Sequence, residues 1–226
     1  MVAGMEKAPA KLSEEWDFRP SVDAIVNLMN SPFSLEVRAK SDEFRKMGQQ
    51  SAEDLFGELC FCILAANTSA EMGLRTQLSI GNHGFIHLPE EKLRDDLKRV
   101  KYRFYNLRSS FIVGARPIMD RLPDIVRNMD PWEAREFLVK NVKGIGYKEA
   151  SHFLRNVGIF RFAILDKHII RMLSSAFPDG REAKITSPSR YLELEKYFLM
   201  LADSLKLEPG ILDLYMWKIA TGKLIK

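Results

Sequence analysis

The hydrophobic pattern along the chain is helical. Apolar residues recur every three or four positions through most of the sequence, and no convincing run alternates apolar and polar residues as a half-buried strand does. Helix-start signals precede three of the periodic segments, at Ser51, at Asp130-Pro131-Trp132-Glu133 and at Ser187-Pro188. Short connections are marked by glycine, most clearly at Gly81-Asn82-His83-Gly84. We therefore predict an all-α protein of about ten helices joined by short loops.

Composition narrows the class of protein only slightly. A length of 226 residues, with 46% hydrophobic and 28% charged residues, is typical of a globular chain of one large or two small domains. No apolar run approaches the roughly 20 residues that cross a bilayer, and Met1 to Lys11 lacks the apolar core of a signal peptide, so a cytoplasmic protein is expected. A net charge of +4 is compatible with nucleic-acid binding without requiring it. Cys60 and Cys62 are spaced for neither a disulfide framework nor a four-cysteine metal site.

The most informative segment joins two amphipathic helices through Gly144-Ile145-Gly146. The helix PWEAREFLVKNV ends there, and YKEASHFLRNV, which contains Lys148, begins at once. Two glycines around one aliphatic residue permit a tight turn with positive backbone dihedrals. They also let a phosphate approach the free N–H groups at the N-terminus of the second helix. This pattern predicts a helix-hairpin-helix, which grips a DNA backbone without reading sequence; the alternative is an ordinary helical hairpin with a glycine cap.

A carboxylate, Asp166, follows Lys148 by 18 positions. In Phe162–Arg171 (FAILDKHIIR) an apolar approach delivers Asp166 to the start of a helix, where it can cap the first N–H groups. The intervening helix and loop can also return Asp166 towards Lys148. Alternatively, Asp166 is only a cap and Lys148 only a solvated lysine.

Taken together, GIGYKEASHFLRNVG and AILDKHIIRML resemble the helix-hairpin-helix, Gly/Pro, Asp superfamily of DNA glycosylases. The resemblance is specifically to the type-2 8-oxoguanine DNA glycosylase/AP lyase family, and it covers the chain from about Phe44 to the C-terminus. The usual Gly/Pro-rich approach to the aspartate is replaced by Ile159–Ala163 (IFRFA). The resemblance implies two helical lobes with DNA in the cleft between them. One lobe would run over 49–160 with the hairpin at about 131–157, and the other would join 1–48 to 161–226.

This resemblance assigns catalytic roles to two residues. Lys148 would attack C1′ of the damaged nucleotide, displace the base as a Schiff base forms, and break the strand by β-elimination. Placement at the positive end of a helix, in a site that DNA desolvates, favours the neutral amine that such an attack needs. Asp166 would stabilise the positive charge that develops on the sugar. Monofunctional relatives lack the lysine, so its presence predicts lyase activity.

Weaker resemblances suggest DNA-contacting residues and a base pocket. Asn67 would fill the gap left by the flipped base and face the orphaned cytosine, and a helix-capping asparagine is the alternative. His168 matches a position that touches DNA phosphate, with a structural histidine as the alternative. Phe104 and Trp217 are the candidate stacking residues of the base pocket, although aromatic residues at helical spacing are more often core.

The C-terminal segment is a candidate for lesion recognition. 8-Oxoguanine carries a proton on N7 where guanine has a bare acceptor, so a discriminating site needs an acceptor aimed at that proton. Gly222 permits a turn back towards Trp217, and we hypothesise that Lys226, with its terminal carboxylate, helps to read the lesion. A frayed, solvated tail is the alternative.

The reaction needs no organic cofactor or catalytic metal. His83 and His87 lack a third ligand at a useful spacing, and by analogy with the superfamily the hairpin carbonyls can hold a monovalent cation. The expected partner is double-stranded DNA that contains 8-oxoguanine or an abasic site, bound by a monomer at the nucleoid.

Two other functions remain open on the sequence alone. An endonuclease III-like glycosylase for oxidised pyrimidines would share the lysine and the aspartate. Many such enzymes carry an iron–sulfur cluster after the catalytic region, and no cysteine follows Cys62. The second alternative is a helix-hairpin-helix DNA-binding protein without catalysis.

Overall fold

A computed structural model describes residues 19–174 and 184–226 of the chain, and these residues form helices and connections without a β-strand. The prediction of an all-α protein is confirmed for this part of the chain. Within it, no helix has the length and apolar character needed to cross a membrane. The segment Met1 to Lys11 lies outside the described residues, as do the first part of the expected lobe 1–48 and a short stretch of the lobe 161–226.

The chain divides into two compact units. One unit contains the described residues up to Arg38 together with Phe162–Leu224, and the other contains Ala39–Arg161 together with Ile225–Lys226. We call the unit that contains Phe162–Leu224 the tail unit and the unit that contains Ala39–Arg161 the hairpin unit. The expected hairpin lobe at 49–160 lies inside the hairpin unit, to which Ile225–Lys226 also belong.

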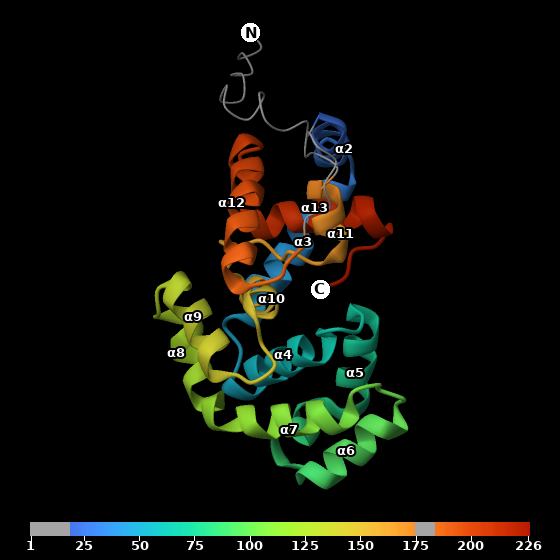
Figure 1. Cartoon of the computed structure of the whole chain (residues 1–226), viewed down its shortest axis with the longest axis vertical. Helices are drawn as coiled ribbons and strands as arrows, with labels where there is room; N and C mark the ends of the chain where they lie inside the picture. Colours follow the sequence, from blue (N-terminus) through green and yellow to red (C-terminus); the bar gives the residue numbers. More distant parts are fainter. Residues whose placement is uncertain (1–18, 175–183) are drawn as a thin grey trace. The chain divides into compact units, whose positions relative to one another are not determined.

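The hairpin unit is built around one buried helix, α4 (Ala52–Ala65), whose residues from Leu55 to Ala65 are all buried. Ser51 begins this helix by accepting a hydrogen bond from the Asp54 backbone N–H at 3.2 Å, as its sequence position predicts. Around α4 pack α5 (Ala70–His87), α7 (Tyr105–Ala115), the 3-10 helix η1 (Arg116–Arg121), α8 (Leu122–Arg127) and α10 (Tyr147–Asn156). Helix α6 (Glu90–Arg99) packs on α5 and α7, and α9 (Pro131–Asn141) on α8 and α10 (Figure 1).

The expected connection at Gly81-Asn82-His83-Gly84 is wrong as a loop, because these residues lie inside α5. The helix is nevertheless interrupted there: Gly81 has φ 71° and ψ 166°, which are not helical values. A left-handed φ of this kind is readily adopted only by glycine. The glycines therefore mark a kink between two helical segments, and His83 and His87 stand one turn apart on the second segment, with ring centroids 4.7 Å apart.

The described part of the tail unit is assembled on α13 (Pro209–Thr221), which packs against α2 (Arg19–Met29), α11 (Lys167–Ser174) and α12 (Pro188–Ser204) (Figure 1). Helix α3 (Phe33–Met47) begins in this unit and continues into the hairpin unit. Ser187 accepts a hydrogen bond from the Arg190 N–H at 3.1 Å, which confirms the predicted start of α12. Phe33 and Tyr215 meet edge to face with ring centroids 5.9 Å apart.

Candidate active site

The predicted hairpin is formed by α9 and α10. Asp130 caps α9 by accepting hydrogen bonds from the Trp132 and Glu133 N–H groups, which confirms the helix start expected from the sequence. The two helices are tied together across the turn by the Tyr147 hydroxyl, which donates to Glu136 at 3.0 Å. The hairpin is therefore a folded unit with its connecting turn at Gly144-Ile145-Gly146.

The two glycines of the turn have different backbone conformations. Gly144 has φ 87°, and a Cβ atom there would lie 2.3 Å from the ring of Phe111, so both the conformation and the space require glycine. Gly146 has φ −102° and ψ −172°, an extended conformation open to any residue, and a Cβ there would meet nothing closer than 3.5 Å. The expectation of positive dihedrals thus holds at Gly144 only. At Gly146 the missing side chain leaves room beside the N-terminus of α10, which is what an approaching phosphate needs.

Lys148 lies in the first turn of α10, directly after this glycine turn. Its Nζ is 3.5 Å from Glu149 Oε1, and its side chain is 26% exposed. The same glutamate accepts a hydrogen bond from the Gly146 N–H through its other oxygen, at 3.4 Å. A partly exposed ion pair with this long separation contributes little to stability. The amine is therefore held at the surface of the hairpin without being locked in place.

Asp166 begins α11. Its Oδ1 accepts hydrogen bonds from the N–H groups of His168 at 2.8 Å and Ile169 at 2.9 Å, so the predicted cap is confirmed. The cap uses one carboxylate oxygen, and among the described residues no hydrogen bond engages Oδ2. The carboxylate is consequently fixed in direction by the helix end through one of its two oxygens.

Two side chains of α12, Tyr191 and Glu195, hold the backbone of the segment that leads to Asp166. The Tyr191 hydroxyl donates to the Ala163 carbonyl at 2.8 Å and accepts from the Leu165 N–H at 3.4 Å. Glu195 accepts from the Ala163 N–H at 3.1 Å. Both α12 side chains are buried. These contacts fix the backbone of the segment that leads to Asp166.

Two of the predicted DNA-contacting and stacking residues lie side by side in the tail unit. The rings of His168 and Trp217 meet edge to face, with centroids 5.2 Å apart. Trp217 Nε1 is buried and has no hydrogen-bond partner among the described residues. The other candidate stacking residue, Phe104, belongs to the hairpin unit, where it is half-buried with the Arg103 guanidinium 4.3 Å from its ring centroid.

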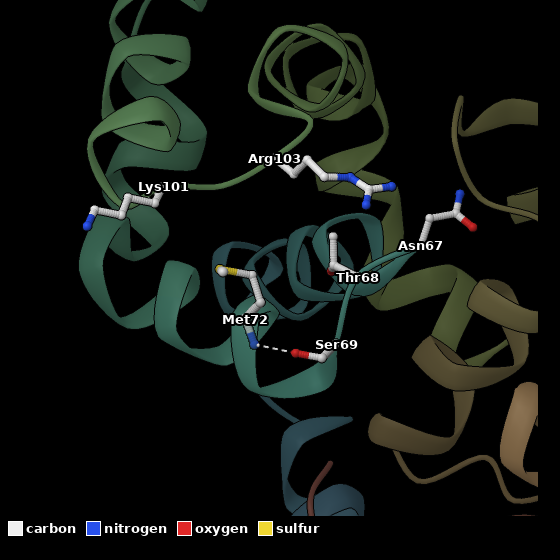
Figure 2. Close-up of a pocket in the computed structure, with 6 residues that line it drawn as sticks. All are labelled: Asn67, Thr68, Ser69, Met72, Lys101 and Arg103. Carbon is white, nitrogen blue, oxygen red and sulfur yellow. Dashed lines mark hydrogen bonds between the residues drawn. The ribbon is translucent and has the colours of Figure 1, made fainter.

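Asn67 lies on the wall of an open pocket of about 220 Å³, lined by Asn67, Thr68, Ser69, Met72, Lys101 and Arg103 (Figure 2). It follows Ala66, the C-cap of α4, and has a left-handed φ of 59°, as residues that terminate helices often do. Its side chain is exposed and makes no hydrogen bond among the described residues. The structure therefore fits both the helix-ending and the base-replacing interpretation. Lys101 and Arg103, which the sequence did not single out, add two cationic groups to the pocket.

Sequence and structure comparisons fit this geometry. The family model for 8-oxoguanine DNA glycosylase matches residues 37–207. Proteins named 8-oxoguanine DNA glycosylase/AP lyase are similar over most of their length. The one from Thermoplasma volcanium is 52% identical over 88% of this chain and 96% of its own, and the one from Thermoplasma acidophilum is 55% identical over 83% and 90%.

The chain belongs to the 8-oxoguanine DNA glycosylase family. Crystal structures of other family members have the same fold. The 8-oxoguanine DNA glycosylase of Thermotoga maritima superposes with a TM-score of 0.85 at 41% identity, covering 93% of this chain and all of the other. The enzyme of Methanocaldococcus jannaschii, in complex with a 15mer DNA containing 8-oxoguanine, superposes with a TM-score of 0.86 at 42% identity and covers 92% of this chain.

Within this family member, the structure adds residues that sequence reasoning missed. Lys226 Nζ donates to Glu58 Oε2 at 2.7 Å and to Gln77 Oε1 at 2.9 Å, in the hairpin unit. The sequence did not indicate Glu58 or Gln77 as site residues, because neither belongs to a recognisable motif. His152, one turn after Lys148, is buried, and its Nδ1 has no hydrogen-bond partner among the described residues.

The electrostatics of this region follow from burial. Burial lowers the pKa of the His152 imidazole well below its usual value, the charges of Arg155 and Lys148 lower it further, and a hydrogen bond to the Lys226 backbone acts in the opposite direction. Burial also raises the pKa of the Cys62 thiol well above its usual value. The imidazole is thus neutral and the thiol protonated at neutral pH, so neither adds a charge to the surroundings of Lys148.

No group of three or more His, Cys, Asp or Glu side chains in the part of the chain that the structure describes is arranged to hold a metal ion. The paired rings of His83 and His87 stay a two-residue cluster there.

Gly144→Ala should destabilise the hairpin. Alanine at a left-handed φ costs roughly 1–2 kcal/mol, and overpacking against Phe111 adds about 1–3 kcal/mol. We expect a fall of several degrees in the midpoint of thermal unfolding and a parallel loss of affinity for duplex DNA. The control is Gly114→Ala on α7, where a Cβ meets nothing within 4 Å and alanine is the better helix former. Equal stability of the two variants would contradict the steric account.

Proposed function

We propose that this chain excises 8-oxoguanine from double-stranded DNA and then cleaves the strand by β-elimination through a Schiff base on Lys148. The observation that carries the proposal is the place of Lys148. It lies in the first turn of α10, next to a glycine turn that leaves room for a phosphate, in a chain whose relatives are named 8-oxoguanine DNA glycosylase/AP lyase. The M. jannaschii family member bound to DNA containing 8-oxoguanine supports the same substrate.

In the first step the neutral amine of Lys148 attacks C1′ of the damaged nucleotide. A bond forms between Nζ and C1′ as the C1′–N9 bond breaks, and the base leaves with the electron pair and gains a proton. Loss of the second amine proton and opening of the sugar ring then give the Schiff base. Abstraction of a C2′ proton expels the 3′ phosphate oxygen, which breaks the strand. Glu149, with Oε1 3.5 Å from Nζ, is the carboxylate beside the amine as it gives up its protons.

Asp166 stabilises the positive charge that builds up on the sugar as the base departs. A carboxylate that is already oriented does not have to reorganise during the reaction, and this preorganisation is the main source of electrostatic catalysis. The cap at the start of α11 supplies the orientation, because Oδ1 is held by two backbone N–H groups. The α12 contacts to Ala163 and Leu165 hold the segment that carries it.

The remaining candidates bind DNA and the base. Gly144 and Gly146 bind DNA through the hairpin turn, in which Gly144 allows the tight packing on Phe111 and Gly146 leaves room for a phosphate. His168 contacts phosphate near the lesion. Asn67 replaces the flipped base opposite the orphaned cytosine, next to a pocket whose Lys101 and Arg103 suit an electron-rich ligand.

The flipped base itself is recognised by other residues. Phe104 and Trp217 stack on it, and Lys226 helps to read it. We place this enzyme on nucleoid DNA, as a monomer.

Excision assays on matched duplexes test this function. The protein should release 8-oxoguanine and nick the product strand while leaving thymine glycol, an oxidised pyrimidine, in place. Release of thymine glycol without 8-oxoguanine would instead assign an endonuclease III-like activity. Binding of duplex without excision or nicking of an abasic site would leave a DNA-binding protein without catalysis.

A further inference from the structure

Glu58 is a buried carboxylate in the middle of the most apolar helix of the hairpin unit. It is 2% exposed, and the residues that follow it, Leu59–Cys62, are fully buried. Removing a carboxylate from water is costly unless it is paired and hydrogen-bonded. Glu58 meets that requirement with two partners: Oε1 accepts from Asn156 Nδ2 at 2.6 Å, and Oε2 accepts from Lys226 Nζ at 2.7 Å.

The ammonium of Lys226 is engaged on three sides. Besides Glu58, it donates to Gln77 Oε1 at 2.9 Å and lies 4.6 Å from the centroid of the Phe61 ring. Gln77 is itself oriented, because its Nε2 donates to the Gly57 carbonyl at 2.9 Å and so turns Oε1 towards the lysine. An ammonium has three N–H donors. With a carboxylate, an amide oxygen and a ring face as neighbours, it has no donor left over for a base.

The other side of Glu58 is fixed from α10, the helix that carries Lys148. Asn156, which donates to Glu58, has its own Oδ1 held by Arg155 Nε at 3.1 Å and Nη2 at 2.9 Å. Both residues are buried at the end of α10. The carboxylate that receives Lys226 is therefore set by the same helix that presents the nucleophile.

The main chain of Lys226 is held as well. The imidazole of His152 hydrogen-bonds the Lys226 backbone and packs edge to face on Phe61, with ring centroids 5.5 Å apart. His152 stands one turn after Lys148 on α10. Lys226 is thus gripped at its ammonium and at its backbone, close to the nucleophilic helix.

We propose that Glu58 and Gln77 are positioning residues for lesion discrimination, which hold the Lys226 side chain as an anchor so that a main-chain oxygen of Lys226 faces the base. The inference rests on the proposed function of Lys226. The discrimination depends on the N7 atom of the base, which is a bare acceptor in guanine and carries a proton in 8-oxoguanine. An ammonium can only donate, so a free one would favour the bare N7 of undamaged guanine, whereas a main-chain oxygen can only accept and favours the N7–H of 8-oxoguanine. Glu58 and Gln77 therefore hold the Lys226 ammonium away from the base and leave a Lys226 main-chain oxygen to face it.

Three single-turnover rates test the proposal: excision of 8-oxoguanine, excision of guanine, and cleavage of a preformed abasic site. Glu58→Gln removes the charge and keeps the shape. We expect it to slow 8-oxoguanine excision by about tenfold to a hundredfold, the range expected when a reacting group is misplaced. The preference for 8-oxoguanine over guanine should fall, and abasic-site cleavage, which needs no base recognition, should keep the wild-type rate. Gln77→Leu should likewise slow 8-oxoguanine excision and lower the preference for 8-oxoguanine over guanine.

Lys226→Met removes the ammonium and leaves Glu58 with only the hydrogen bond from Asn156. It should lose excision to the same extent as Glu58→Gln. The double variant Glu58→Gln/Lys226→Met buries no unpaired carboxylate, so it decides the question even if either single variant folds poorly. It should be no worse than the more damaged single variant, because both changes break one unit. The control is Asp54→Asn, which neutralises a carboxylate one turn away on α4 that contacts Ser51 and Asn82 instead.

Two results would overturn the inference. The first is wild-type excision by Lys226→Met, and the second is a Glu58→Gln variant that loses excision and abasic-site cleavage equally, as a merely structural residue would. If the wild-type protein itself releases no 8-oxoguanine, the proposed function fails first, and the wild-type rate distinguishes the two cases.

Discussion

Lys148→Gln should abolish strand cleavage and covalent trapping while leaving the affinity for duplex DNA close to that of the wild type. Glutamine keeps most of the length of the lysine side chain but has no nucleophilic amine, so no Schiff base can form. The fold should survive, because the ion pair that is lost, Lys148–Glu149, spans 3.5 Å at a partly exposed position and contributes little. Borohydride reduction of a mixture with abasic duplex, followed by denaturing electrophoresis, measures the trapped complex.

The matched control is Lys140→Gln, which removes a lysine from the exposed side of α9 in the same hairpin. It should trap as the wild type does, with only the small loss of affinity that one fewer positive charge near phosphate brings. A trapped complex formed by Lys148→Gln would remove Lys148 from the nucleophilic role.

Asp166→Asn should slow base excision by roughly a hundredfold, since one well-placed electrostatic group is worth about 3 kcal/mol in the transition state. The loss should come without unfolding, because asparagine caps helices as well as aspartate does and can accept the same N–H groups of His168 and Ile169. Single-turnover release of 8-oxoguanine gives the rate, and thermal unfolding reports on the fold.

Asp130→Asn is the corresponding control for the cap. Asp130 holds the start of α9 in the same way, through the N–H groups of Trp132 and Glu133, and has no place in the chemistry. Its amide variant should excise the base at the wild-type rate. If Asp166→Asn also did so, Asp166 would be a cap and nothing more.

The features that could be predicted from the sequence are those with local causes. The caps at Ser51, Asp130 and Ser187 depend on residues two or three positions away, and all three form as expected. Asp166 could be placed at a helix start for the same reason. Gly81 shows the limit of local signals, because the glycine that breaks a helix looks the same in sequence whether a loop or a kink follows.

Contacts between distant parts of the chain could not be predicted. Gly144 needs its glycine partly because of Phe111, which lies on another helix. Glu58 and Lys226 are 168 positions apart, and nothing in the sequence around either residue marks the pairing. Tyr191 and Glu195 read as ordinary helix positions, although they hold the backbone before Asp166. Such contacts follow from how helices pack, which periodicity does not specify.

The proposed function requires Lys148 to form the covalent bond to the sugar of an excised 8-oxoguanine. The direct measurement is borohydride trapping of the wild-type protein on a duplex with a single 8-oxoguanine, followed by proteolysis and mass spectrometry of the peptide joined to DNA. We expect one modified site, Lys148, with no adduct on the matching duplex that carries guanine. Release of 8-oxoguanine with the adduct on another lysine, or with no adduct at all, would contradict the assignment of Lys148 as the nucleophile.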